Sequence, residues 1–473
     1  MIKWFYYWGE WRRAYWGLID QYPELFAFLH RMYVLQYQRE PDSVGVSDAV
    51  FRDRTRAAAV GTSKKLKGQF ASRGGLAGAT HASTVSQNYN EAGDIDVLFD
   101  ARVARDTCLG VGEKLFSKMK EKYPEINGAF YQNGRRRVLP SDQHAGCPVI
   151  TLDLKLTTKA GFRFLRLLSV VYLHGFRSTA VVRMVFMHPL ITWGNLLKIT
   201  MMSVSAERML DRIHPKIIIS CNEQGGADAL ILFALAKKKG IYTIQYLHCP
   251  PTRQFVPFIC DEYWSWSELT AQMLLGGTTD TRVINIGSLE HENRADVLAP
   301  GNRTEPEERR VLFLSQMGMD EAWGIRAVAD GMKKFIEGVQ RYSEAVRVRV
   351  REHPQAKAAE REMLENVMRG VPFEVTTKAV PLAQDIAWAT HVYSISSTGI
   401  LSALLDGKPA YLLWNSELDE VYGRCFLPDQ NIVNSSKDFV ESLNRFLPPD
   451  YAELILQQVL GSPGAMDRAV ERV

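Results

Sequence analysis

Residues 215–248 read PKIIISCNEQGGADALILFALAKKKGIYTIQYLH, and this stretch decides the fold class. It opens with an apolar segment at 215–221, as expected for a strand buried on both faces of a parallel sheet. A turn then leads into an amphipathic helical segment that ends at Gly240, a residue type typical of helix C-termini. A second apolar strand follows at 241–248. The order strand, helix, strand predicts a doubly wound α/β domain.

The same alternation continues on both sides of this stretch. Further strand-like segments lie at 96–101, 129–140, 147–155, 260–268 and 282–288, and helical spacing occupies 112–125 and most of 162–210. We therefore assign residues 94–288 to a first Rossmann-like domain. Residues 1–93 form an N-terminal extension, which is aromatic-rich and helical in pattern at first and then polar.

A second α/β unit follows a linker. Residues 289–310 are charged, contain proline and are poor in apolar residues, which is typical of a connection between domains. Strand and helix patterns then alternate again as far as the apolar segment 409–414. We assign residues 311–473 to a second Rossmann-like domain, so the expected fold is α/β with two such domains facing a cleft.

The composition is that of an ordinary globular protein. The chain has 473 residues, a formal net charge of +4 and a pI near 8.6, a balance too mild to indicate nucleic acid binding by itself. The six cysteines form no CxxC pair and no zinc-ligand spacing, so reduced thiols, no metal and a cytoplasmic location are expected. We see no signal peptide and no transmembrane segment.

Three hydroxyl residues and a glycine lie between a predicted strand at 390–395 and a predicted helix at 400–407. They are Ser396, Ser397, Thr398 and Gly399. Hydroxyls and free backbone N–H groups at a helix N-terminus bind phosphate, and a glycine allows close approach. Ser and Thr also cap helices without any ligand. A cap needs one hydroxyl, so three in a row favour a phosphate site.

A second candidate lies at the end of the predicted strand 346–350, where the sequence reads Arg351, Glu352, His353, Pro354. In an α/β sheet ligands bind at the carboxyl ends of strands. A histidine there can donate to a phosphate oxygen and offset charge on a leaving nucleotide. The alternative is a histidine that only makes local contacts at a strand end before a proline turn.

Two further candidates follow successive strands of the first domain. Glu223 comes after the strand 215–221, and His248 ends the strand 241–248. Either side chain could act as a general base in the cleft. Glu223 could instead interact only with the N-terminus of its own helix, and His248 could be a loop histidine packed by Pro250 and Pro251.

The motifs REHP and SISSTGILSALLDGKP, together with 217–251, 261–268 and 284–288, resemble GT-B glycosyltransferases that make bacterial surface polysaccharides. The nearest resemblance is to sialyltransferases and capsule transferases that use CMP-activated acidic sugars, and to teichoic acid polyol-phosphate transferases. It covers roughly 94–430. It implies that His353, Pro354 and Ser396–Thr398 hold the donor phosphate, with Arg351 and Gly399 beside them. Glu223-Gln224-Gly225 matches the acidic motif of these families at its first and last positions, and His248 precedes Cys249 where a glycine is usual.

The resemblance implies a metal-independent glycosyltransferase that needs no cofactor beyond its nucleotide-sugar donor, with a CMP-sugar favoured. The acceptor would be a surface glycan or a lipid-linked glycan. Basic and apolar residues in 162–202 suggest peripheral contact with the inner membrane. The alternatives are a UDP-N-acetylglucosamine-type epimerase on the same fold, and a nucleotide- or glycan-binding assembly protein without catalysis.

Overall fold

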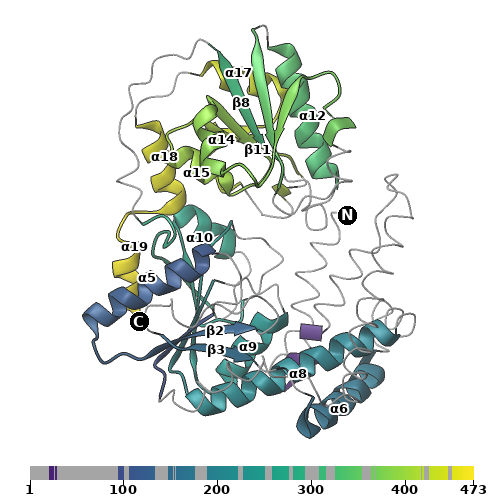
Figure 1. Ribbon diagram of the computed structural model, residues 1–473, viewed down its shortest axis with the longest axis vertical. Helices are drawn as coiled ribbons and strands as arrows, with labels where there is room; N and C mark the ends of the chain where they lie inside the picture. Colours follow the sequence, from purple (N-terminus) through teal and green to yellow (C-terminus); the bar gives the residue numbers. More distant parts are fainter. Residues whose placement is uncertain are drawn as a thin grey trace.

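The computed structural model describes most of both predicted domains (Figure 1). The described residues are 21–25, 27–28, 94–100, 106–133, 147–152, 154, 156–175, 189–221, 227–250, 258–275, 281–292, 308–315, 325–342, 344–353, 364–366, 368–416, 418–419, 425–445 and 450–473. Most of the predicted N-terminal extension and linker lies outside this set. Within it, Leu25, Ala27 and Phe28 are buried in the core of the first domain.

The first domain is built on a seven-stranded parallel sheet. Its strands lie in the order β3-β2-β1-β4-β5-β6-β7. Their bounds are β1 Val97–Asp100, β2 Gly128–Asn133, β3 Val149–Leu152, β4 Ile217–Ser220, β5 Tyr242–Tyr246, β6 Glu262–Ser265 and β7 Arg282–Asn285. The central strands are apolar and buried, because helices cover both faces of the sheet. The predicted strands 215–221 and 241–248 are confirmed as β4 and β5.

The second domain is built on a six-stranded parallel sheet in the order β10-β9-β8-β11-β12-β13. The strand bounds are β8 Arg309–Leu314, β9 Val346–Arg351, β10 Phe373–Thr376, β11 His391–Ser394, β12 Ala410–Leu413 and β13 Ile432–Val433. The sequence analysis predicted β8 to β12 but not the two-residue strand β13. Two parallel sheets with alternating helices confirm the prediction of two Rossmann-like domains in the GT-B arrangement.

Helices connect and cover the strands. In the first part of the chain they are α5 Asp106–Lys122, α6 Thr158–Gly175, α8 Pro189–Ile213, α9 Ala227–Lys238 and α10 Glu268–Leu275. In the second part they are α12 Ile325–Arg341, α14 Leu382–Trp388, α15 Gly399–Leu405, α17 Ser436–Asn444, α18 Tyr451–Leu460 and α19 Ala465–Arg472, with a short 3-10 turn η5 at Asp429–Asn431. None of the helices in the described ranges combines the length and apolar character needed to cross a bilayer.

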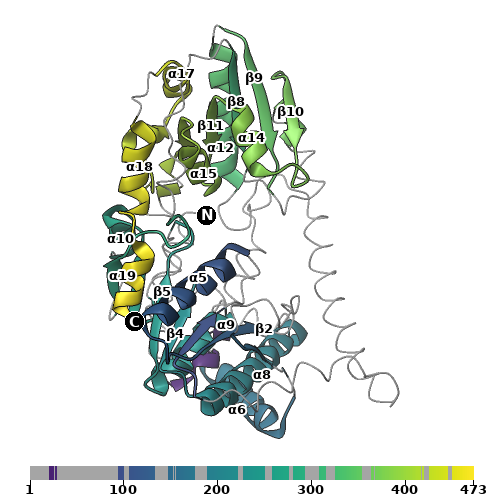
Figure 2. The ribbon, with the colours of Figure 1, turned by 60° about the vertical axis from the view of Figure 1, so that its left-hand side comes forward.

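The last two helices bring the chain back to the first domain. Helix α18 packs on α15 of the second domain and on α10 of the first, and α19 packs against α5. Figures 1 and 2 show this path, with α18 bridging the two sheets and α19 beside the first one. The sequence analysis assigned 311–473 to the second domain, yet α19 adds its apolar face to the core of the first.

Helix α19 is held to the first sheet by a buried carboxylate. Glu262, at the start of β6, is 2% exposed and accepts hydrogen bonds from Arg472 at 2.5–3.1 Å and from the Trp264 indole at 3.0 Å. Arg282 contributes a second ion pair at 3.1 Å. Burial raises the pKa of Glu262, but the hydrogen bonds, that from Arg472 above all, outweigh burial and lower the pKa overall.

Arg472→Ala should therefore destabilise the first domain by about 1–3 kcal/mol, because a buried carboxylate loses its main partner while Arg282 remains. The measurement is thermal unfolding followed by circular dichroism. Because the Glu262 pKa is lowered on folding, the wild-type advantage should be complete above the ordinary pKa near 4.5 and shrink as the pH falls below it. Lys437→Ala, at an 81% exposed side chain on α17, is the control and should change little. If the two variants lowered the unfolding midpoint equally, the contact of Arg472 with Glu262 would not be what holds α19 to the first domain.

Candidate functional site

The carboxyl ends of three strands in the second sheet are level with one another. The register pairs Leu314 of β8 with Arg351 of β9 on one side and with Ser394 of β11 on the other. The sheet order changes direction between β8 and β11, which is the topological switch point where doubly wound sheets bind ligands. Residues that directly follow these strands, including Ser315, therefore line the expected binding edge.

The predicted hydroxyl turn follows β11 at this switch point, and one of its hydroxyls acts as a local cap. Ser397 Oγ accepts a hydrogen bond from the Gly399 N–H at 3.1 Å. The Ser394 hydroxyl stabilises the turn from below, because it accepts from the Ser397 N–H at 3.1 Å and donates to the Leu314 carbonyl at 3.0 Å. Ser397 therefore accepts from the first N–H of α15, whereas Thr398, which occupies the N-cap position, makes no side-chain capping bond.

The remaining two hydroxyls of the turn are not used in this way. Within the described part of the chain, Ser396 and Thr398 make no side-chain hydrogen bond, although Ser396 is only 7% exposed. A Cβ at Gly399 would lie 2.9 Å from Leu314 Cδ1 and 3.3 Å from Ser397 Oγ, so the turn is tight enough to favour glycine. Two hydroxyls thus remain to donate to a ligand oxygen at the edge of the sheet.

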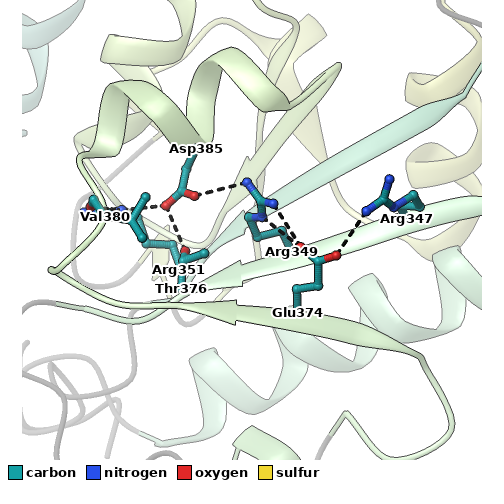
Figure 3. Close-up of polar contacts among 7 residues, drawn as sticks. All are labelled: Arg347, Arg349, Arg351, Glu374, Thr376, Val380 and Asp385. Atoms are coloured by element: carbon teal, nitrogen blue, oxygen red, sulfur yellow. Dashed lines mark hydrogen bonds and ion pairs between the residues drawn. The ribbon is translucent and has the colours of Figure 1, made fainter.

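The Arg351 guanidinium is committed to a buried carboxylate (Figure 3). It donates to Asp385 Oδ2 at 2.5 Å and to the Val380 carbonyl at 2.8 Å, and the Asp385 side chain is fully buried. Thr376 also donates to Asp385, at 2.8 Å. These contacts join β9, β10 and α14, so Arg351 fixes the strand end that precedes His353. A direct contact of Arg351 with a donor stays a prediction.

A second arginine on the same face of β9 extends this network. Arg349 donates to Glu374 Oε2 at 2.9 Å, forms an ion pair with Asp385 at 3.4 Å and stacks 4.0 Å from the Trp388 ring. Hydrogen bonds from Arg349 and then Arg347 lower the pKa of Glu374. Figure 3 shows the arginine and carboxylate side chains alternating in a row. The strand carries its arginines on the α14 side and its valines on the other.

His353 lies two residues beyond the end of β9 and is half-buried. Ser396 lies two residues beyond β11, and β8 separates these two strands. Neighbouring strands are about 4.8 Å apart, so the two strand ends stand roughly 10 Å apart with Ser315 between them. Pro354 lies outside the described residues. The structure therefore brings His353 and Ser396–Gly399 to the same edge of the second sheet.

The first sheet has its own switch point, between β1 and β4. Asp100 and Ser220, the last residues of these strands, are paired in register and both buried, and the Ser220 hydroxyl donates to Asp100 Oδ2 at 2.8 Å. Glu223, three residues beyond β4, lies outside the described residues. His248 follows β5 by two residues and is half-buried. Asp100 thus adds a buried carboxylate at the carboxyl end of the sheet that His248 follows.

A cavity of about 730 Å³ lies where the two domains meet. The carboxyl ends of β6 and β7 contribute Glu268 and Asn285, the second domain contributes Asp429, and α18 contributes Gln457 and Gln458. Amide and carboxylate groups of this kind can hydrogen-bond a hydroxyl-rich ligand. None of the predicted site residues that the structure describes lines this cavity, so it is separate from the switch-point edge.

Sequence reasoning missed Ser315, Asp385 and Asp100. Ser315 and Asp100 directly end or follow apolar strands, and that position alone could have marked them. Asp385 lies within a helical pattern and shows no local sign of its ion pairs, which join residues 34 and 36 positions apart. Among the described residues, no group of three or more His, Cys, Asp or Glu side chains could hold a metal ion.

The sequence matches no protein-family model and no curated protein. Solved structures show a likeness of fold at low identity. The UDP-GlcNAc 2-epimerase from Neisseria meningitidis, solved with UDP-GlcNAc, has a TM-score of 0.46 and 12% identity over 80% of this chain and 98% of its own. MurG from Acinetobacter baumannii gives 0.42 and 8% over 80% and 99%. The lipopolysaccharide galactosyltransferase WaaB gives 0.46 and 13% over 80% and 97%.

Asp385→Asn should destabilise the second domain by about 3 kcal/mol, because Arg351 and Arg349 lose a buried negative partner. Hydrogen exchange at 346–353 and 373–376 is the measurement, and protection should fall there first. Glu374→Gln is the matched control, since that carboxylate is 50% exposed and a surface pair contributes less than about 1 kcal/mol. A larger effect of Glu374→Gln than of Asp385→Asn would contradict this account of the network.

Proposed function

We propose that this protein is a glycosyltransferase that moves a sugar from a nucleotide-activated donor to a surface glycan or a lipid-linked acceptor. One observation carries the proposal. The switch point of the second sheet holds a tight hydroxyl turn in which Ser397 provides the cap and Ser396 and Thr398 remain for a ligand. The chemistry of that turn suits phosphate oxygens, which are common to all nucleotide-sugar donors.

The donor phosphate would lie between the ends of β9 and β11. His353 donates from one side and the Ser396–Gly399 turn from the other, with Ser315 beneath. Charge develops on the phosphate oxygens as the nucleotide leaves, so donors that are already in place stabilise the transition state. Arg351 supports this site by fixing the end of β9 through Asp385.

The acceptor hydroxyl would approach from the carboxyl edge of the first sheet. Glu223 or His248 removes its proton, the hydroxyl oxygen attacks the anomeric carbon, and the bond from that carbon to the nucleotide phosphate breaks. The nucleotide leaves with the bonding electron pair. Asp100, whose carboxylate accepts from the Ser220 hydroxyl, is a further carboxylate at this edge. The proposed transfer needs neither a metal ion nor a further cofactor.

The donor nucleotide is proposed to be CMP, following the resemblance of REHP and SSTG to transferases that use CMP-activated sugars. UDP is the competing choice. Both carry the phosphate that the turn would hold, so the distinction lies in the base and ribose contacts. Direct binding measurements separate the two.

Thermal unfolding with CMP, CDP, UDP, GDP and ADP is the first measurement. A nucleotide at 100 times its dissociation constant adds about 2.7 kcal/mol to the stability of the domain that binds it, so the midpoint should rise by a few degrees. We expect the rise with CMP or CDP. A rise with UDP alone would replace the CMP donor with a UDP-sugar, and no rise with any of the five would refute the phosphate site.

Two serine variants separate binding from capping within this experiment. Ser396→Ala and His353→Ala should abolish the nucleotide-dependent rise and leave the unliganded midpoint nearly unchanged. Ser397→Ala should lower the unliganded midpoint, because loss of a helix cap costs about 1 kcal/mol. If Ser396→Ala bound nucleotide like the wild type, the hydroxyl turn would be only a structural element.

Glu223→Gln should lower the rate of nucleotide release from the donor by about 10²- to 10⁴-fold, the usual contribution of a general base, while nucleotide binding persists. The assay is run with EDTA and a panel of glycan acceptors. Full activity of Glu223→Gln would transfer the role to His248, tested as His248→Gln. Complete loss of activity in EDTA would contradict a metal-independent transfer. Turnover of UDP-N-acetylglucosamine without acceptor and without nucleotide release would indicate an epimerase instead.

A further inference from the structure

Helix α6 has an outer face that the rest of the described chain does not cover. Its exposed positions follow helical spacing: Thr158, Lys159, Phe162, Leu165, Arg166 and Ser169. Phe162 is 71% exposed and Leu165 is 59% exposed, and Leu156, just before the helix, is 51% exposed. Two large apolar side chains therefore stand between two basic ones on a single face.

More than half of the large exposed apolar side chains lie on α6, just before it, or on α8, the helix packed against it. The described part of the chain has seven large hydrophobic residues that are exposed, and four of them, Leu156, Phe162, Leu165 and Trp193, lie on α6, just before it or on α8. Single exposed apolar residues are ordinary on a protein surface, whereas a group of them marks an interaction site.

Helix α6 packs on the core through the face opposite to its outer face. Ala160 and Leu167 are buried there, and Arg163 points inward to Glu24 at 3.3 Å and Glu207 at 3.1 Å. Helix α6 packs on α8 along this inner side, at the edge of the first domain (Figure 1). The charge of Arg163 is therefore compensated inside. Lys159 and Arg166 are the exposed basic residues of the outer face: the Lys159 ammonium also forms an ion pair with Glu207 at 2.9 Å, and the Arg166 guanidinium lies 5.6 Å from the Tyr22 ring.

The sequence segment from 154 to 206, which includes α6, contains no acidic residue, although Asp153 precedes it and Glu207 follows it. Asp and Glu make up 53 of the 473 residues, so a stretch of 53 residues would hold about six at average density, yet 154–206 holds none. The same stretch contains seven basic residues: Lys155, Lys159, Arg163, Arg166, Arg177, Arg183 and Lys198. A segment of one sign of charge over this length fits a partner surface of uniform negative charge.

We propose that the outer face of α6 binds the surface of an anionic lipid bilayer. Phe162 and Leu165 enter the boundary between headgroups and acyl chains, and Lys159 and Arg166 stay at the level of the headgroups, where anionic lipids attract them. The helix lies in the plane of the interface and does not cross the bilayer, in keeping with its length and composition. Binding of this kind places the enzyme where lipid-linked acceptors are found.

Flotation of the full-length protein with lipid vesicles tests the proposal. One set of vesicles contains phosphatidylcholine alone, and the other an equimolar mixture of phosphatidylcholine and phosphatidylglycerol. The wild type should float with the mixed vesicles and much less with the neutral ones, and added salt should weaken the binding because it screens exposed charges. Absence of binding to the mixed vesicles, or equal binding to both sets, would overturn the proposal.

Two matched pairs of variants assign the binding to this face. Phe162→Ser with Leu165→Ser should weaken binding by about tenfold or more, because the apolar insertion is lost. Leu454→Ser with Val375→Ser, at side chains that are 47% and 37% exposed on other elements, should leave it unchanged. Lys159→Gln and Arg166→Gln should each weaken it by roughly fivefold, whereas Lys437→Gln, on α17, should not.

Two controls keep the result independent of folding and of catalysis. All of these side chains are exposed, so the unfolding midpoint and the nucleotide-dependent rise in solution should be the same as in the wild type. If the protein bound no nucleotide, the proposal of membrane binding would still stand. If it bound no vesicles, the proposed nucleotide site would still stand. If the Phe162 and Leu165 variant lost self-association by size-exclusion chromatography while vesicle binding was absent, the face would be an interface between two copies of the chain.

Discussion

Both sheets are parallel throughout, and their central strands are buried on both faces. This constraint leaves the carboxyl ends of the strands as the places where polar side chains and free backbone groups meet a ligand. The register then decides which residues share that edge. Because Leu314 is level with both Arg351 and Ser394, the residues that follow β9, β8 and β11 form one row. The candidate donor site is therefore a consequence of strand alignment, because His353, Ser315 and Ser396 each lie within two residues of a strand end.

Rigidity at that row comes from a buried ion-pair network at the end of β9. Arg351 and Arg349 reach Asp385 on α14, and Thr376 on β10 completes the set. The network links β9 and the edge strand β10 to α14, which limits how far His353 can move relative to the hydroxyl turn. A buried carboxylate with several donors is costly to break, so this support acts at a distance from the chemistry.

The sequence predicted what local periodicity can show. Apolar runs predicted β4, β5 and β8, and the alternation of valine and arginine predicted β9. The strand–turn–helix pattern around Ser396 predicted a phosphate site at a strand end, which the strand order places at the switch point of the second sheet. After residue 414 no individual helix or strand was predicted, although β13 and helices α17, α18 and α19 complete both domains. The packing of α19 on the first domain depends on a residue 210 positions away, because Arg472 pairs with Glu262. Likewise Ser220 meets Asp100 across 120 residues, a contact that no local pattern contains.

Two segments at which the chain leaves or re-enters the first domain are in contact with each other. One is the end of β7 near Gly287, and the other is the turn 461–464 between α18 and α19. The Ser288 N–H donates to the Leu460 carbonyl at 2.9 Å, and a Cβ at Gly461 would lie 2.0 Å from the Trp266 carbonyl. Gly287, Gly461 and Gly464 all have positive φ, a conformation that other residues rarely adopt. Since α18 packs on the second domain and α19 on the first, the turn 461–464 is a place where the chain crosses from one domain to the other. The interdomain cavity is lined by residues of both domains, so its shape depends on the angle between the domains.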